Sequence, residues 1–269
     1  MKLRLALALA LSTTLAAPAA AASVDGVAIH SSVQGAGKTI IFVHGWTCDE
    51  TGWDAQVPAF DHGYRVVTLD LPGHGKSDGP TDGKFSMELF ARAVDAVRAE
   101  VGADKVVLVG HSMGAAVIRQ YALDHPEHVA GLVAVDGPLD MRPMANFPGF
   151  GELTMETRKA AVESMFVSST SPEIRTAVLA TMLGTPRATA EGAMAAMLDP
   201  KNQSDRKIMA PAMTIWAGNS NFPDDGSTRE LVPDWSSQKF EGTGHFVMME
   251  QPAKFNAALR SFIEQRAKY

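Results

Sequence analysis

The chain has 269 residues, of which 46% are hydrophobic and 20% charged, and its formal net charge is −6 at pH 7. This length supports one large domain with a full hydrophobic core, and the acidic balance gives no electrostatic argument for nucleic acid or an anionic membrane as a partner. The single cysteine, Cys48, has no partner for a disulfide within the chain. It is expected to be a buried thiol, or one without a chemical role.

The first 22 residues have the composition of a cleavable secretory signal peptide. Lys2 and Arg4 provide a basic start, residues 5–17 carry no charge, and residues 20–22 are alanines. An apolar stretch of this length is too short to span a bilayer, and no later stretch is long enough. The sequence therefore predicts cleavage after Ala22 and a secreted or periplasmic protein without a membrane span.

Strands and helices alternate through residues 39–135. Runs rich in valine, isoleucine and leucine predict buried strands at residues 39–43, 64–69, 105–109 and 129–135. A helix with Ser86 as its N-cap is predicted over residues 86–101, and another runs from about Gly114 to residue 124. Nearly continuous apolar strands that alternate with helices are typical of an α/β fold with a mostly parallel sheet flanked by helices.

Residues 138–206 lack a strand pattern and are predicted to form a helical cap inserted into the α/β core. Cap residues, glycines and prolines delimit its helices at residues 154–167, 171–183 and 189–198. The insertion is rich in methionine and phenylalanine, with Met141, Met144, Met155, Met165, Met182, Met194, Met197, Phe147, Phe150 and Phe166. An apolar, adaptable cap of this kind suits the covering of an acyl chain or an aromatic group.

The core resumes after the cap. Strands are predicted at residues 212–217 and 238–241, and a closing helix begins at Pro252. The predicted organisation is therefore a signal peptide at residues 1–22, a first core part at 23–137, the cap at 138–206 and a second core part at 207–269.

A candidate nucleophile lies between the third of the first four strands and the helix that follows it. Residues 110–114 read G-x-S-x-G, with an apolar strand before them and small residues after them. A serine in a sharp strand-to-helix turn projects from the sheet, and the flanking glycines leave room for its strained backbone. The context predicts Ser112 as the nucleophile.

Together with this turn, three further segments resemble the α/β-hydrolase family. Residues 42–46 (Phe-Val-His-Gly-Trp) resemble the family's oxyanion strand end, residues 70–77 its glycine-rich turn, and residues 242–246 (Gly-Thr-Gly-His-Phe) its catalytic histidine loop. The segments occur in the family's order and spacing, and the likeness is greatest to exported members. The resemblance implies an α/β-hydrolase fold and an oxyanion hole made by the backbone N–H groups of Trp46 and Met113. A packing role for Trp46 is compatible with the same assignment.

The general base follows from the family's chain order, which is serine, then acid, then histidine. Only His125, His128 and His245 come after Ser112. The first two lie at a helix end beside a proline, where a surface or capping role fits, whereas His245 lies between the last strand and the last helix. We expect His245 to be the general base. The histidines of the turn motifs are expected to be structural: His44, His74 and His111.

The acid departs from the commonest family pattern, because the usual position after the strand at residues 212–217 is occupied by Asn221. Some family members place the acid at the end of the preceding strand, where Asp136 follows four apolar residues. A carboxylate there is costly to bury unless it has a partner. Asp136 is therefore the first candidate, Asp224 or Asp225 the alternatives, and the lack of a triad acid the remaining one.

These residues predict a serine hydrolase that cleaves small-molecule carboxylic esters of small to medium apolar acyl groups. A lactonase, a carbon–carbon bond hydrolase or a cofactor-free perhydrolase would use the same residues, and a non-catalytic binding protein is the alternative of another class. Dehalogenase and epoxide hydrolase chemistry is disfavoured, because those enzymes carry aspartate where this chain has Ser112. No dinucleotide, P-loop or zinc-protease motif occurs, so neither a cofactor nor a metal is predicted.

Overall fold

The computed structural model describes residues 22–147, 149–220, 222 and 226–269. Its central sheet has the strand order β3-β5-β4-β6-β7-β8-β9. The strands are β3 (Ser31–Gly35), β4 (Thr39–Val43), β5 (Arg65–Leu69), β6 (Val106–His111), β7 (Val129–Val135), β8 (Ala212–Ala217) and β9 (Trp235–Phe240). All neighbouring strands run parallel except β3, which pairs antiparallel with β5. The predicted mostly parallel sheet is confirmed.

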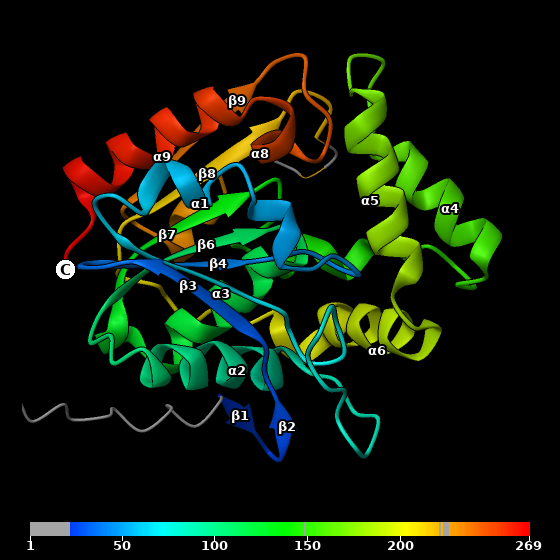
Figure 1. Cartoon of the computed structure of the whole chain (residues 1–269), viewed down its shortest axis with the longest axis horizontal. Helices are drawn as coiled ribbons and strands as arrows, with labels where there is room; N and C mark the ends of the chain where they lie inside the picture. Colours follow the sequence, from blue (N-terminus) through cyan, green and yellow to red (C-terminus); the bar gives the residue numbers. More distant parts are fainter. Residues whose placement is uncertain (1–21, 148, 221, 223–225) are drawn as a thin grey trace, which may run out of the picture.

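Helices cover both faces of this sheet (Figure 1). The core helices are α1 (Val57–Phe60), α2 (Met87–Glu100), α3 (Met113–Asp124), α7 (Thr228–Leu231), α8 (Val247–Glu250) and α9 (Pro252–Arg266). Figure 1 shows α2 and α3 on one side of the sheet and α1 and α9 on the other. The central strands β4, β6 and β7 are buried along their whole length, because a strand covered on both faces has no polar side.

The segment between β7 and β8 contains α4 (Met155–Ser164), α5 (Pro172–Gly184) and α6 (Arg187–Leu198). Figure 1 shows these three helices together at one end of the sheet. The Ser171 hydroxyl caps α5 by accepting from Ile174 N–H at 3.3 Å. Buried Arg158 of α4 donates to the carbonyl oxygens of Met182 and Thr185 at the end of α5. This guanidinium satisfies carbonyls that a helix end leaves without partners.

Two strands of the central sheet differ most from the sequence prediction, and the short strands β1 (Ser23–Val24) and β2 (Val27–Ala28), which form a separate two-stranded sheet, are not predicted either. Strand β3 was not predicted, and β9 begins at Trp235 rather than at residue 238. Both lie at the edges of the sheet, and much of each is exposed. Edge strands carry polar side chains and so lack the apolar run that identifies a buried strand. No helix among the described residues has the length and apolar character needed to cross a membrane.

Candidate active site

Ser112 lies at the turn from β6 into α3, with backbone angles φ 53° and ψ −117°. Its N–H donates to Val135 O at 2.8 Å, which ties the turn to the neighbouring strand. A Cβ on Gly110 would lie 2.3 Å from the carbonyl oxygen of Gly114, and one on Gly114 would lie 2.4 Å from that of Val43. Both positions therefore require glycine, and the strained turn projects the serine from the sheet.

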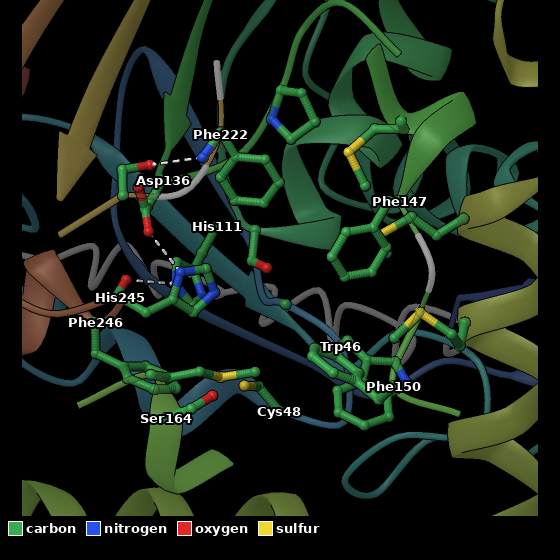
Figure 2. A pocket seen from close by; sticks show the side chains of 18 of the residues that line it. Trp46, Cys48, His111, Asp136, Phe147, Phe150, Ser164, Phe222, His245 and Phe246 are labelled. Atoms are coloured by element: carbon green, nitrogen blue, oxygen red, sulfur yellow. Dashed lines mark hydrogen bonds and ion pairs between the residues drawn. The ribbon is translucent and has the colours of Figure 1, made fainter. Parts of the chain in front are cut away.

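Asp136 and His245 follow different strands of the sheet and meet in space. Asp136 follows β7, where its φ is 42°, and His245 lies in the loop between β9 and α8. His245 Nδ1 donates to Asp136 Oδ2 at 2.6 Å, as the dashed line in Figure 2 shows, and Ala217 N–H donates to Asp136 Oδ1 at 3.0 Å. Because Nδ1 carries a proton in this bond, Nε2 is the ring nitrogen that is left to accept one.

The environment of Asp136 keeps its carboxyl ionised. Burial by itself would raise the pKa, since the side chain is only 3% exposed. The hydrogen bonds from His245, Ser220 and Ala217 N–H, together with the charge of a protonated His245, outweigh burial and hold the pKa below its usual value. A buried carboxylate with these partners is suited to orient an imidazole and to stabilise its protonated form.

The loop that carries His245 is anchored to the cap and to α8. His245 N–H donates to Met165 O at 3.0 Å, just beyond the end of α4. Gly244 N–H donates to Glu250 Oε2 at 2.7 Å, and Glu250 Oε1 accepts from Thr170 Oγ1 at 3.1 Å. The imidazole is therefore positioned by backbone and side-chain bonds on both sides of the loop.

His111, directly before the nucleophile, packs against His245 with ring centroids 4.6 Å apart. Its Nε2 donates to His245 O at 3.0 Å. Burial, and then the neighbouring His245, lower the pKa of His111 to about 3, so the ring stays neutral. His111 thus supports the histidine loop as a neutral hydrogen-bond donor.

The proposed oxyanion donors, Trp46 and Met113, follow backbone that lies beside Ser112. Met113 is the first residue of α3, where a helix leaves its N–H groups free and its dipole favours negative charge. Trp46 follows Gly45, and a Cβ built on Gly45 would lie 3.2 Å from Ser112 Cβ. Any side chain at position 45 would press on the nucleophile, and glycine lets the backbone that leads to Trp46 pass beside it.

A cavity of about 350 Å³ opens on Ser112, Asp136 and His245. Much of its wall is apolar and comes from the loop after β4 and from the cap: Trp46, Phe147, Phe150, Met182, Met194 and Met197. Figure 2 shows Trp46, Phe147 and Phe150 grouped across the cavity from Asp136 and His245. The described lining includes no lysine or arginine, and its only carboxylate is Asp136. Predominantly apolar walls with a few polar groups are typical of small-molecule sites.

The usual position of the acid, Asn221, and the two alternative acids, Asp224 and Asp225, lie outside the described residues. Cys48 lies in the cavity wall, half-buried and free, and burial raises the pKa of its thiol to about 12.

Ser112 faces the same cavity as His245, and no hydrogen bond joins Ser112 Oγ to the His245 ring in the described structure. Such contacts are often long in a free enzyme and shorten around substrate.

A second polar cluster lies on the core, where atoms of His30, Glu50 and Asp70 that could bind a metal lie within 4.8 Å of one another. Glu50 Oε1 is 2.8 Å from His30 Nε2 and 2.9 Å from Lys76 Nζ. The two Asp70 oxygens accept the N–H groups of Glu50 and Lys76, each at 2.8 Å. These carboxylate oxygens already accept hydrogen bonds from protein groups, and the Lys76 ammonium supplies the positive charge that a metal ion would otherwise provide. The arrangement is that of a structural ion cluster.

Comparisons with known proteins match most of the chain. The family model described as alpha/beta hydrolase fold matches residues 38–252. A 2-hydroxy-6-oxononadienedioate/2-hydroxy-6-oxononatrienedioate hydrolase of Paraburkholderia phymatum is 30% identical over 263 residues, which cover 88% of this chain and 91% of that protein.

Solved structures are similar over most of the chain as well. The crystal structure of a putative aryl esterase from Burkholderia cenocepacia is 25% identical with a TM-score of 0.77, and the match covers 91% of this chain and 96% of that one. Est816, an N-acyl homoserine lactone degrading enzyme, is 24% identical with a TM-score of 0.77 and coverage of 90% and 99%. The arrangement of strands and helices is shared with both.

Proposed function

The chain belongs to the alpha/beta hydrolase fold family and is a hydrolase, and on that premise we propose that it cleaves uncharged carboxylic esters of small to medium apolar acyl groups through an acyl-enzyme on Ser112. The observation that carries the proposal is the 2.6 Å bond between His245 Nδ1 and Asp136 Oδ2 at the cavity that Ser112 lines. That bond orients the imidazole and leaves Nε2 as the proton acceptor that a serine nucleophile requires.

In the proposed reaction, His245 Nε2 takes the proton of Ser112 Oγ while Oγ attacks the ester carbonyl carbon. The N–H groups of Trp46 and Met113 stabilise the oxyanion that forms. The protonated imidazole then gives its proton to the departing alkoxide, and the alcohol leaves. A water molecule, deprotonated by His245, then attacks the carbonyl carbon of the acyl-enzyme. The bond to Ser112 Oγ breaks, Oγ takes the proton back from the imidazolium, and the carboxylic acid leaves. Asp136 stays ionised and stabilises the imidazolium in both halves of the reaction.

The composition of the cavity supports an uncharged substrate. The oxo-dienedioate named for the relative from Paraburkholderia phymatum is a dicarboxylate, and a carboxylate is costly to bury without a cationic or hydrogen-bonding partner. The described lining of this cavity offers no lysine or arginine for that purpose. The volume of about 350 Å³ lies at the small end of the roughly 300–1,000 Å³ that ligand pockets span, which fits a short acyl chain or one aromatic ring.

The carbon–carbon bond hydrolase is the second candidate, because relatives that cover nearly the whole chain carry that activity in their names. The two functions are separated by turnover of a p-nitrophenyl butyrate ester and of an oxo-dienedioate by the same preparation. We expect turnover of the ester and little or none of the dicarboxylate. Faster turnover of the dicarboxylate would contradict the esterase proposal.

The nucleophile is tested independently of the substrate. A fluorophosphonate probe is expected to label the native protein at Ser112, because the serine is activated by His245. The Ser112→Ala variant should be neither labelled nor active while keeping the native circular dichroism spectrum. Undiminished labelling of that variant would remove Ser112 from the mechanism.

We also propose that the chain is exported, on the strength of its charged start, apolar stretch and alanine-rich end over residues 1–22. Most of this segment lies outside the described residues. Protein recovered from the periplasm of a bacterial host should begin at Ser23 in N-terminal sequencing. Recovery of cytosolic protein that still begins at Met1 would contradict the proposal.

A further inference from the structure

The turn that carries the Trp46 N–H is held by two hydrogen bonds from the cap. Thr185 Oγ1, just after α5, donates to Thr47 O at 2.8 Å. Trp46 Nε1 donates to Ala190 O of α6, also at 2.8 Å. All four residues are buried. The cap therefore contacts the proposed oxyanion donor through fixed polar bonds as well as through the apolar cavity wall.

The backbone of this turn is in a strained conformation. Cys48 N–H donates to Gly45 O at 3.2 Å and closes a four-residue turn in which Thr47, the third residue, has a φ of 55°. A positive φ at that position is the type II geometry, which favours glycine or asparagine. Threonine is branched at Cβ and is a rare occupant of this region, so the conformation persists only where its surroundings enforce it.

Thr185 is well placed to provide that support. It caps the end of α5 with an extended backbone ahead of Pro186, and its carbonyl oxygen accepts from Arg158 Nη2 at 2.9 Å. Its side chain is buried, and Thr185 is absent from the described residues that line the cavity. The hydroxyl therefore contacts the turn at 2.8 Å, and more distantly Thr181 O of α5 at 3.5 Å, and does not face the substrate space.

We propose that Thr185 is a positioning residue, whose hydroxyl holds the Thr47 carbonyl so that the Trp46 N–H stays aimed at the oxyanion. The inference rests on the proposed ester hydrolysis and extends it, because it gives a residue of the cap a part in the chemical step. An oxyanion donor acts through its preorganised direction. Loss of the hydroxyl should weaken binding of the transition state and leave binding of the ground-state ester unchanged.

The test is Thr185→Val, which replaces the hydroxyl with a methyl group of similar size. For a butyrate ester we expect kcat to fall roughly tenfold with KM unchanged, a smaller loss than complete removal of an oxyanion donor. The affinity for a trifluoromethyl ketone, which forms a tetrahedral adduct on the serine, should fall by the same factor. Thr185→Ser, which keeps the hydroxyl, should restore both quantities.

Thr176→Val is the matched control, because Thr176 lies in α5, the helix that Thr185 caps, and its hydroxyl donates to Pro172 O within that helix. It should leave kcat and ketone affinity at native values. If valine is not tolerated at position 185, Thr185→Ala compared with Thr185→Ser gives the same contrast between a missing and a retained hydroxyl.

The outcomes separate the inference from the proposed function. A native protein that hydrolyses esters, and a folded Thr185→Val variant with kcat within twofold of native, would overturn the inference alone. A Thr185→Ser variant as impaired as the valine variant would also overturn it, since packing would then be the cause. Lack of any Ser112-dependent ester hydrolysis by the native protein would overturn the proposed function, and the inference with it.

Discussion

The two sides of the cavity are built in different ways. On the sheet side, Ser112, Asp136 and the turn at Trp46 follow parallel strands, and their backbones pass so closely that glycine is required at positions 110 and 114. On the cap side, α5 and α6 contribute flexible methionine side chains. The difference indicates that the sheet fixes the geometry of the chemistry, and that the cap adapts to the substrate and holds the loops through a few polar bonds.

The largest contrast is expected from the same substitution on the two sides. Gly114→Ala would place a Cβ 2.4 Å from Val43 O, whereas a Cβ on Gly184 at the end of α5 meets no atom within 4 Å. We expect Gly114→Ala to lower the free energy of unfolding by roughly 3 kcal/mol, and Gly184→Ala to change it by less than about 1 kcal/mol. Denaturant unfolding measures both. Equal denaturation midpoints for the two variants would show that the sheet side and the cap side tolerate an added methyl group equally well.

A charge placed in the cap wall should change substrate binding more than chemistry. Met197 lines the cavity and is half-buried, so the ammonium of Met197→Lys can reach the cavity mouth. We expect KM for a butyrate ester to rise roughly tenfold, with a much smaller change in kcat. Met155→Lys is the control, because Met155 is 60% exposed on the same cap. A variant whose loss lies mainly in kcat would assign Met197 to the chemical step instead.

The smallest effect concerns a carboxylate of the core that does not line the cavity. Burial opposes ionisation of Glu50, but hydrogen bonds from Ser32, Lys76, His30 and Thr68 lower its pKa to about 2. This stabilisation is present above the usual glutamate pKa of 4.5 and is lost as the pH falls toward the lowered pKa of about 2.

Glu50→Gln should therefore lower the free energy of unfolding at pH 7 by about 1 kcal/mol, since the group is partly solvated. The difference from the native protein should shrink as the pH falls from 4.5 toward 2, with kcat at pH 7 unchanged. Urea unfolding across this pH range measures it. A difference that grows as the pH falls would contradict the assigned pKa direction.

The sequence predicts the buried elements more closely than the exposed ones. The strands at residues 39–43, 129–135 and 212–217 match β4, β7 and β8 residue for residue, because an apolar run is unambiguous when both faces are covered. The edge strand β3 is missed, since its polar sequence has no such signal. A strand at an edge is exposed to solvent and can be polar, and only the assembled sheet shows which strands lie at its edges.

The site shows the same limit. Ser112 and His245 stand in local motifs, whereas Asp136 has only its position at a strand end. Its contact with His245 depends on the order of β7, β8 and β9 in the sheet, which a single strand does not encode. Thr185 carries no signal at all, because its bond to Thr47 joins residues 138 positions apart. Interactions of that range follow from the packing of the cap onto the core.

The most direct test of the account is the turnover of Asp136→Asn beside Asp224→Asn and Asp225→Asn. Asparagine at position 136 would keep the size of the side chain but remove the charge that the imidazolium needs and the acceptor that fixes its tautomer. We predict that kcat falls by roughly three to four orders of magnitude for Asp136→Asn, with a native fold and small changes in the other two variants. Near-native turnover of Asp136→Asn, with a crippled Asp224→Asn or Asp225→Asn variant, would contradict the account and place the acid in the loop after β8.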